Sequence, residues 1–564
     1  MAHTKTQTAP ENDLPASQRD ELETAIVDLQ AGARSWAALT VSQRATLLQR
    51  VRASVGATAA EWARTAAQSK GLGPQHPLRG EEWLSGPYAV LGALDGYIST
   101  LRALARGASP LDGVRIDEAP GARVRAHVFP THAIDNLLLS GFTGEIWLRP
   151  GVTAGEATRT AGLAQRRDAP GGIGLVLGAG NITSIPVLDV LYELLAAGRV
   201  VLLKVNPTQD ALVPVFERTL APLIEPGFLR IVRGGGAVGA FLTTHSAIDH
   251  VHITGSAATF NAIAPALTVP ITAELGGVSP IIVVPGRWTP ADLRFQAEHI
   301  VTMRLHNSGH NCIAGQVVIV SRDWPQREDF LRALRDAYAA APARPVWYPH
   351  GTERLEDADR SYPDARWCAE RSRLLVELGD NDDPRALETT EYFAPVLGVI
   401  ELAGTGQEFL DTAVAHANDH LAGTLGANIL IDPETERALG PGMDRAIADL
   451  RYGGIAVNAW TGLLFATPIL SWGAFPGSTL EDVGSGIGVV HNTLLLDGIE
   501  RSVLRGPFRP FPRSLGRGRF SVLPKPPWFV SSRTAAAVSE GLTRYHIDHS
   551  PRGLVATLAK AMGA

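Results

Sequence analysis

A cysteine in a polar segment is the first residue with the chemistry of a nucleophile. Cys312 lies in the stretch HNSGHNCIAGQ, whose polar, glycine-containing flanks are unlike those of a core strand. Most free cysteines are small buried hydrophobes, but a reactive thiolate needs a polar, partly exposed pocket. We therefore predict that Cys312 is a catalytic nucleophile. Cys368 has charged neighbours in a helical pattern and is predicted to be structural.

Two histidines near this cysteine open two alternatives. His306 and His310 are four residues apart and could bind zinc together with Cys312, or His310 could form a Cys–His dyad with it. Zinc is disfavoured because no fourth ligand is near in the sequence and Gly309 interrupts the helix. We predict no metal site and keep the dyad as an alternative.

A carboxylate between two apolar runs has the chemistry of a general base. Glu274 follows VPIT and precedes a Gly-Gly turn and PIIVV. A lone carboxylate usually lies on a solvated surface. At the end of a buried strand, however, desolvation raises its pKa, which suits a general base.

A glycine pattern resembling a phosphate-binding loop is interpreted differently. Gly234, Gly236 and Gly239 form a GxGxxG between an apolar run and a helical one. No acidic residue closes a strand about twenty positions later, as a dinucleotide fingerprint requires. We interpret these glycines as a turn.

Alternating apolar and helical segments must position these side chains. The alternation from residue 172 to 285 predicts a parallel sheet covered on both faces, and a second alternation runs from Ala291 to about Asn458. Amphipathic helices are expected from Ser17 to Ala67. Short strands outside the main sheet are expected between Arg123 and Arg149. The predicted fold class is α/β, with two doubly wound parallel-sheet domains.

Composition and charge exclude several classes of protein. The 564 residues, 45% of them hydrophobic, predict two to four globular domains. A net charge of −6 and two cysteines argue against a nucleic-acid binder and a disulfide scaffold. The N-terminal stretch shows no signal peptide. The longest apolar stretch, residues 185–203, is interrupted by Asp189, Glu193 and Arg199, so we predict no membrane span and a cytoplasmic location.

Taken in order, these motifs resemble the aldehyde dehydrogenase superfamily. Glu274 is followed 38 residues later by Cys312, and Lys204 follows Asn181 by 23 residues. Further family-like segments are Thr254-Gly255-Ser256, Glu391-Tyr392-Phe393-Ala394-Pro395, Gly454-Ile455-Ala456-Val457-Asn458 and Gly484-Ser485-Gly486. The resemblance covers about residues 20 to 500.

The resemblance implies an NAD(P)-dependent aldehyde oxidation. Cys312 would attack the aldehyde, the Asn181 amide and the Cys312 backbone N–H would hold the oxyanion, and Glu274 would activate water to hydrolyse the thioester. The implied cofactor-binding residues are Lys204 at the adenosine ribose, Gly255 and Ser256 at the pyrophosphate, Leu275, Glu391 at the nicotinamide ribose, and Phe393 against the nicotinamide.

The chain departs from the family pattern at several positions. Gly180 replaces the tryptophan before the asparagine, Phe260 follows a Gly-Ser segment that lacks its closing glycine, and His310 replaces a glutamine. Pro207 stands where NAD-preferring members often carry a glutamate, so NADP is admissible.

The domain assignment and assembly follow from the same resemblance. The predicted parts are a flexible leader (1–16), a cofactor-binding domain (17–121 and 151–273), an oligomerisation arm (122–150 and 480–500), a catalytic domain (274–479) and a C-terminal extension (501–564). An isolated ribbon with unpaired edges should find a partner, so we expect a homo-oligomer, at least a dimer. The proline-rich tail, with five large aromatic residues, is expected to lie irregularly along the surface near the substrate mouth.

Two other functions compete with aldehyde oxidation. A CoA-acylating dehydrogenase or acyl-thioester reductase keeps the cysteine but commonly lacks the hydrolytic glutamate. A catalytically retired binding or structural member would be expected to lose Cys312 or Asn181. The substrate is expected to be a small-molecule aldehyde, of apolar character if the aromatic segment after Asn458 lines its tunnel. The residues of that segment are Trp460, Leu463, Leu464, Phe465, Trp472 and Phe475.

Overall fold

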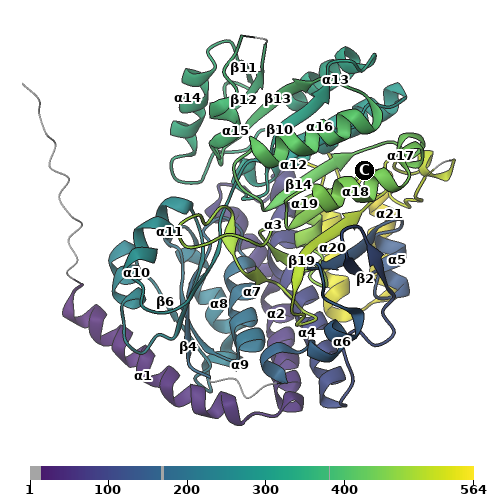
Figure 1. Cartoon of the computed structure of the whole chain (residues 1–564). Helices are drawn as coiled ribbons and strands as arrows, with labels where there is room; N and C mark the ends of the chain where they lie inside the picture. The colour runs from purple at the N-terminus through teal and green to yellow at the C-terminus, as the bar shows by residue number, and fades with distance from the viewer. Residues whose placement is uncertain (1–13, 167–170, 380, 517, 564) are drawn as a thin grey trace, which may run out of the picture.

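Two sheets organise the chain, as the alternating sequence pattern predicts (Figure 1). The computed structural model describes residues 14–166, 171–379, 381–516 and 518–563. The leader predicted for residues 1–16 therefore lies, up to residue 13, outside the described residues. The α/β fold class is confirmed, with parallel strands at the centre of both sheets.

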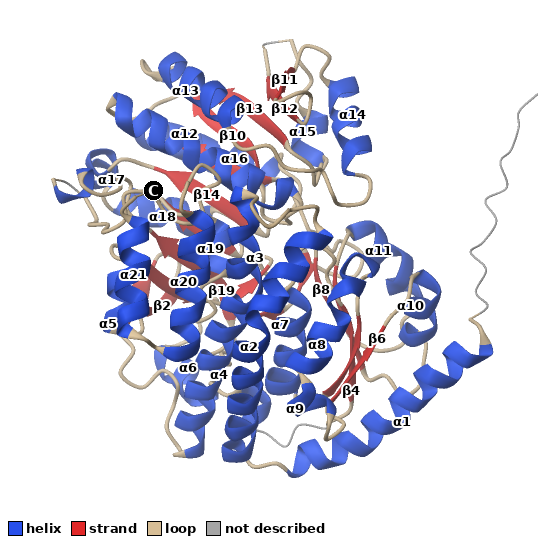
Figure 2. Ribbon diagram, turned by 180° about the vertical axis from the view of Figure 1, so that it is seen from behind, coloured by secondary structure: helices blue, strands red, loops and turns tan. Residues whose placement is uncertain are grey.

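The smaller sheet has the strand order β17-β8-β7-β4-β5-β6. Its parallel strands are short and mostly apolar, because helices cover them (Figure 2). These strands are β4 (Ile173–Leu177), β5 (Val200–Lys204), β6 (Leu229–Val232), β7 (His250–Thr254) and β8 (Ile271–Glu274). The short β17 (Gly486–Ile487) pairs antiparallel with β8.

Helices from the amino-terminal half of the chain cover this sheet. Contacts with β4 and β5 come from α1 (Ala16–Ala38) and α7 (Ile185–Tyr192), while α2 (Val41–Ser69) packs on α8 (Val213–Thr219) and α4 (Ala89–Ala105). The helices expected from residue 17 to 67 are thus confirmed. Gly234 lies in the loop between β6 and α10 (Gly236–Thr243), but Gly236 and Gly239 belong to the helix, so the interpretation of these glycines as a turn is wrong for those two.

The larger sheet has the order β1-β2-β3-β19-β15-β14-β9-β10-β13-β12-β11. It is parallel from β19 to β12 and antiparallel at both margins. Its parallel strands are β9 (Ser279–Val283), β10 (Gly315–Ser321), β12 (Arg373–Glu377), β13 (Val396–Leu402), β14 (Gly426–Leu430), β15 (Gly454–Val457) and β19 (Ile499–Arg505). Cys368 is buried in the marginal strand β11 (Arg366–Cys368), where a helical context was expected.

The predicted arm joins this sheet within the same chain. Strands β1 (Ile116–Ala119), β2 (Arg123–Phe129) and β3 (Thr143–Leu148) are paired in series, and β3 pairs with β19. The expectation that 123–149 lies outside the main sheet is therefore wrong. Because β3 pairs with β19 of the same chain, these strands do not need a second subunit to pair at that edge. The homo-oligomer stays a prediction.

The tail is docked on its own chain, but it is not irregular throughout. Residues 506–516 and 518–534 are mostly loops, followed by α20 (Ala535–Asp548) and α21 (Pro551–Ala561). The expectation of an irregular tail is wrong for these two helices, because α20 contains no proline and Pro551 stands at the first position of α21, where a helix tolerates it. Phe508, Trp528 and Phe529 are buried, whereas Phe520 is exposed. Within the described residues, no helix is both long and apolar enough to cross a membrane.

Candidate active site

A tight left-handed turn presents Cys312. The helix α12 (Pro290–Leu305) ends there, and Asn307, Ser308 and Gly309 all have positive φ, of 53°, 58° and 73°. Gly309 is required, because a Cβ there would lie 2.8 Å from the carbonyl oxygen of Ala394. The Asn307 side chain fixes the turn by donating to the carbonyl oxygen of His310 at 3.0 Å. The turn leaves Cys312 half-buried ahead of β10.

The environment of the thiol keeps it protonated in the free protein. Burial, followed by the nearby carboxylates of Glu274 and Glu391, raises the pKa of the Cys312 thiol well above its usual value. The backbone N–H groups of Cys312 and Ile313 act in the opposite direction. These two donors also mark where negative charge near the sulfur is stabilised.

Asn181 is hydrogen-bonded to the turn that carries Cys312. It follows β4, and its Nδ2 donates to the carbonyl oxygen of His310 at 3.0 Å. The neighbouring Gly180 departs from the family for a packing reason: a Cβ there would lie 2.6 Å from Thr208 Oγ1, which donates to the Gly180 carbonyl.

The structure does not form the alternatives that involve the histidines. His310 Nδ1 donates to the carbonyl oxygen of Phe393 at 2.6 Å, and its Nε2 accepts from Tyr348 N–H at 3.4 Å. Both ring nitrogens are thus occupied away from Cys312, and burial lowers the pKa of His310 to about 3. His306 is buried against the Trp460 ring. A Cys–His dyad and a zinc set at these residues therefore lack the required geometry.

Glu274 ends β8 and is buried at 2% exposure. Burial, and then the charge of Asp189, raise the pKa of Glu274 to about 6, against the opposing effects of His491, Trp472 and His252. Trp472 Nε1 donates to one carboxylate oxygen, while Oε2 is buried without a hydrogen-bond partner. A carboxyl group in this state can take a proton from water near neutral pH.

The residues implied to bind the cofactor gather at the carboxyl ends of parallel strands. Lys204 ends β5, where burial lowers its pKa and Asp210 opposes this. Gly255 and Ser256 follow β7, and the Ser256 hydroxyl accepts from Thr259 N–H at 3.2 Å, capping α11 (Ala257–Ile263). This edge is where parallel sheets bind nucleotides.

Among the other residues implied to bind the cofactor, Glu391 places its carboxylate against Gly276. Burial raises the pKa of Glu391 to about 7. Its Oε1 is buried without a partner, and a Cβ on Gly276 would collide with the carboxylate. Leu275 is buried, and Phe393, with φ of 46°, packs against Tyr348 at 5.1 Å between ring centroids. The unpartnered carboxylate oxygen fits a ribose hydroxyl, so these residues are compatible with NAD(P).

A cavity of about 700 Å³ opens onto Cys312. Four of the six residues proposed for the tunnel line it, namely Trp460, Leu463, Phe465 and Trp472. Leu464 is in the core, and Phe475 lies under the Arg501 guanidinium at 4.9 Å. The tail also contributes to the wall, a role that spacing along the chain could not reveal. Its lining residues include Leu523, Trp528, Val538, Leu542, Tyr545 and Leu558.

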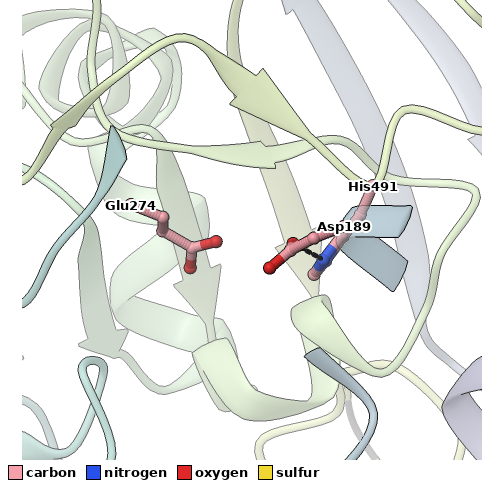
Figure 3. Close-up of side chains that lie close together, drawn as sticks. All are labelled: Asp189, Glu274 and His491. Atoms are coloured by element: carbon pink, nitrogen blue, oxygen red, sulfur yellow. Dashed lines mark ion pairs between the residues drawn. The ribbon is translucent and has the colours of Figure 1, made fainter. Parts of the chain in front are cut away.

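Two residues beside Glu274 were missed by sequence reasoning. Asp189 and His491 are fully buried, and their side chains turn toward Glu274 (Figure 3). Asp189 stood out in the sequence only as a break in an apolar stretch. No motif or spacing marks His491.

The family model described as aldehyde dehydrogenase family matches residues 150–346. The 4,4'-diaponeurosporen-aldehyde dehydrogenase of Staphylococcus aureus is 23% identical over 328 residues, covering 55% of this chain and 67% of that protein. Betaine aldehyde dehydrogenase 2 of Rhizobium meliloti is 37% identical over 120 residues, covering 21% of this chain and 24% of that protein. The chain thus spans only part of the curated relatives it matches.

Solved structures extend the likeness along most of the chain. An NAD-dependent aldehyde dehydrogenase from Sinorhizobium meliloti has a TM-score of 0.60 at 18% identity, covering 86% of this chain and 87% of that one. Lactaldehyde dehydrogenase from Escherichia coli has a TM-score of 0.57 at 18% identity, covering 87% and 92%. At this identity the likeness shows the fold alone. Together, the sequence match over residues 150–346 and the shared fold confirm the resemblance that the motifs predict, to the aldehyde dehydrogenase superfamily.

Proposed function

We propose that this chain oxidises an aldehyde to a carboxylate, with NAD(P)⁺ as the hydride acceptor, through a thiohemiacetal and a thioester on Cys312. One observation carries most of the weight. Asn181, which follows a strand of the smaller sheet, is hydrogen-bonded to the turn that holds Cys312, and the Glu274 carboxylate acts on the same thiol. Nucleophile, oxyanion donor and general base therefore meet at one place.

Each side chain has a defined part in the proposed reaction. The Cys312 thiol gives its proton to water in the cavity and its sulfur bonds to the carbonyl carbon, while the Asn181 amide and the Cys312 N–H donate to the resulting oxyanion. When bound, NAD(P)⁺ accepts the hydride that leaves this carbon. Glu274 then takes a proton from the water that hydrolyses the thioester. Lys204 and Glu391 would hold the two riboses.

The cavity supports an apolar aldehyde as the substrate. Its wall is formed mainly by apolar and aromatic side chains, and it combines the segment after Asn458 with the tail helices α20 and α21. A volume of about 700 Å³ accommodates a chain much longer than a short aldehyde. The tail therefore acts as part of the substrate site.

The competing function is a CoA-acylating dehydrogenase. It would form the same thioester but transfer the acyl group to a thiol instead of water. A glutamate that is buried, unpartnered at one oxygen and titrating near pH 6 favours hydrolysis. A steady-state rate that requires CoA would overturn the hydrolytic proposal.

The decisive experiment separates acylation from hydrolysis. We expect Cys312→Ala to abolish aldehyde-dependent nicotinamide reduction while the protein still folds. Glu274→Gln should release one equivalent of reduced nicotinamide as a burst and then stall, with the steady-state rate lowered about 10²- to 10⁴-fold. Cys368→Ala, at the cysteine of β11, is the matched control and should leave both phases unchanged. Substantial turnover by Cys312→Ala would refute the proposal.

A further inference from the structure

The buried base Glu274 faces a second buried pair that the proposed reaction does not yet use. One carboxylate oxygen of Asp189, one of Glu274 and a ring nitrogen of His491 all lie within 4.8 Å of one another (Figure 3). His491 Nε2 is 3.5 Å from Asp189 Oδ1, and neither ring nitrogen of His491 has a hydrogen-bond partner. Glu274 Oε2 is also unpartnered. A proton on Glu274 therefore has a nearby acceptor, a ring nitrogen of His491 that makes no hydrogen bond.

The surroundings leave few other routes for that proton. Glu274, Asp189 and His491 are exposed by 2%, 1% and 1%. The other oxygen of Glu274 is taken by the Trp472 indole, which can donate but not accept. A general base in such a site must pass its proton on before it can act again.

Asp189 is equipped to support a charged imidazole. Burial alone would raise its pKa, but the two imidazoles of His252 and His491 outweigh this and hold it at about 2. Thr254 donates to its Oδ2 at 3.0 Å, and His252 Nε2 lies 3.6 Å from the same atom. The other face of His491 meets the Phe465 ring at 4.9 Å. Asp189 is thus the carboxylate that offsets positive charge on His491.

We propose that His491, oriented by Asp189, takes from Glu274 the proton that Glu274 removes from the hydrolytic water. In the hydrolysis, the water oxygen bonds to the acyl carbon, the carbon–sulfur bond breaks, and its electron pair stays on Cys312 as thiolate. One water proton goes to Glu274 and then to His491, while the product leaves as the carboxylic acid. The imidazolium, balanced by Asp189, keeps this proton until product release admits water. Both residues act through Glu274, and the inference rests on the proposed function.

The test uses a substitution that the backbone tolerates. His491 has φ of 54°, a region that glycine adopts freely, so His491→Gly should fold and leave space for imidazole. We expect an unchanged burst and a steady-state rate lowered about 100-fold. Added imidazole should restore part of that rate, more at pH 8 than at pH 6, because only the neutral form accepts a proton. Asp189→Asn should lower the same rate without changing the burst.

A matched control addresses structural damage. His250, the first residue of β7, forms a similar buried pair, with its Nδ1 2.9 Å from Glu193 Oε1. His250→Asn should leave the rate of hydrolysis unchanged. A wild-type steady-state rate in His491→Gly would overturn the relay alone. The relay would also be overturned if the steady-state rate fell and added imidazole restored none of it. The same holds if the purified protein contained one divalent metal ion per chain. Failure of the wild type to reduce the nicotinamide with any aldehyde would instead refute the proposed function.

Discussion

Trp472 allows the basicity of Glu274 to be tested independently of the carboxylate itself. Its Nε1–H is the one hydrogen-bond donor to the Glu274 side chain among the described residues. The bond favours the ionised form and opposes the burial that raises the pKa of Glu274 to about 6. Trp472→Phe removes the donor and keeps an aromatic ring beside Phe465, which packs edge-on at 5.5 Å.

The expected magnitude follows from the strength of such a bond. A hydrogen bond to a charged group contributes about 1.5–3 kcal/mol, and about 1.4 kcal/mol corresponds to one pH unit. The base is active when deprotonated, so the hydrolytic rate falls as pH drops through its pKa. In the wild type this limb should be centred near pH 6. In Trp472→Phe its midpoint should move upward by about one to two pH units, with the plateau rate kept.

The assay is the steady-state rate from pH 5 to 9, measured where a burst shows that hydrolysis limits turnover. Trp460→Phe is the matched control, since Trp460 lines the same cavity but its Nε1 has no hydrogen-bond partner. An unmoved limb in Trp472→Phe, or an equal movement in both variants, would refute the assignment of Glu274 as the titrating base.

Three further predictions address the cofactor, the substrate and the tail. Because Pro207 supplies no carboxylate to repel a 2′-phosphate, kcat/KM with NADP should equal that with NAD within about tenfold; a larger NAD preference contradicts this. Leu542→Trp, in the cavity wall on α20, should raise KM for long apolar aldehydes but not for short ones, and equal effects on both would exclude the tail from the substrate site. Asp292 is buried and accepts from Arg509 and Arg513 of the tail, so Asp292→Asn should lower the free energy of unfolding by about 3 kcal/mol. It should also speed proteolysis near residue 505, and an unchanged cleavage rate would show that these ion pairs do not anchor the tail.

The sequence predicts the core of the site because its signals are local. The polar flanks of Cys312 indicate a turn, and the apolar run before Glu274 places it at the end of a strand. The structure has both features, with Glu274 the last residue of β8. Asn181 and Lys204 were implied only by the resemblance to the family, and each lies at or after the end of a parallel strand.

The tail shows where local signals were extended too far. Prolines exclude helix as far as Pro527. The following AAAVSEGLTRYHID contains no proline and forms α20. That helix packs on residues 77–88, more than 400 positions earlier in the chain. Such a contact depends on the assembled fold, so neither the docking nor its part in the cavity could be inferred from composition.

The charges that interrupt the apolar stretch 185–203 explain why the buried pair Asp189 and His491 could not be predicted from the sequence. They were used only to exclude a membrane span, since a charge in an apolar run usually marks its exposed side. In the structure Asp189 and Glu193 are buried, and each faces histidines from elsewhere in the chain. Burying a carboxylate is costly unless a partner offsets its charge. An acidic residue inside an otherwise apolar helix therefore implies a buried partner. For Asp189, that partner is His491, and both lie close to Glu274.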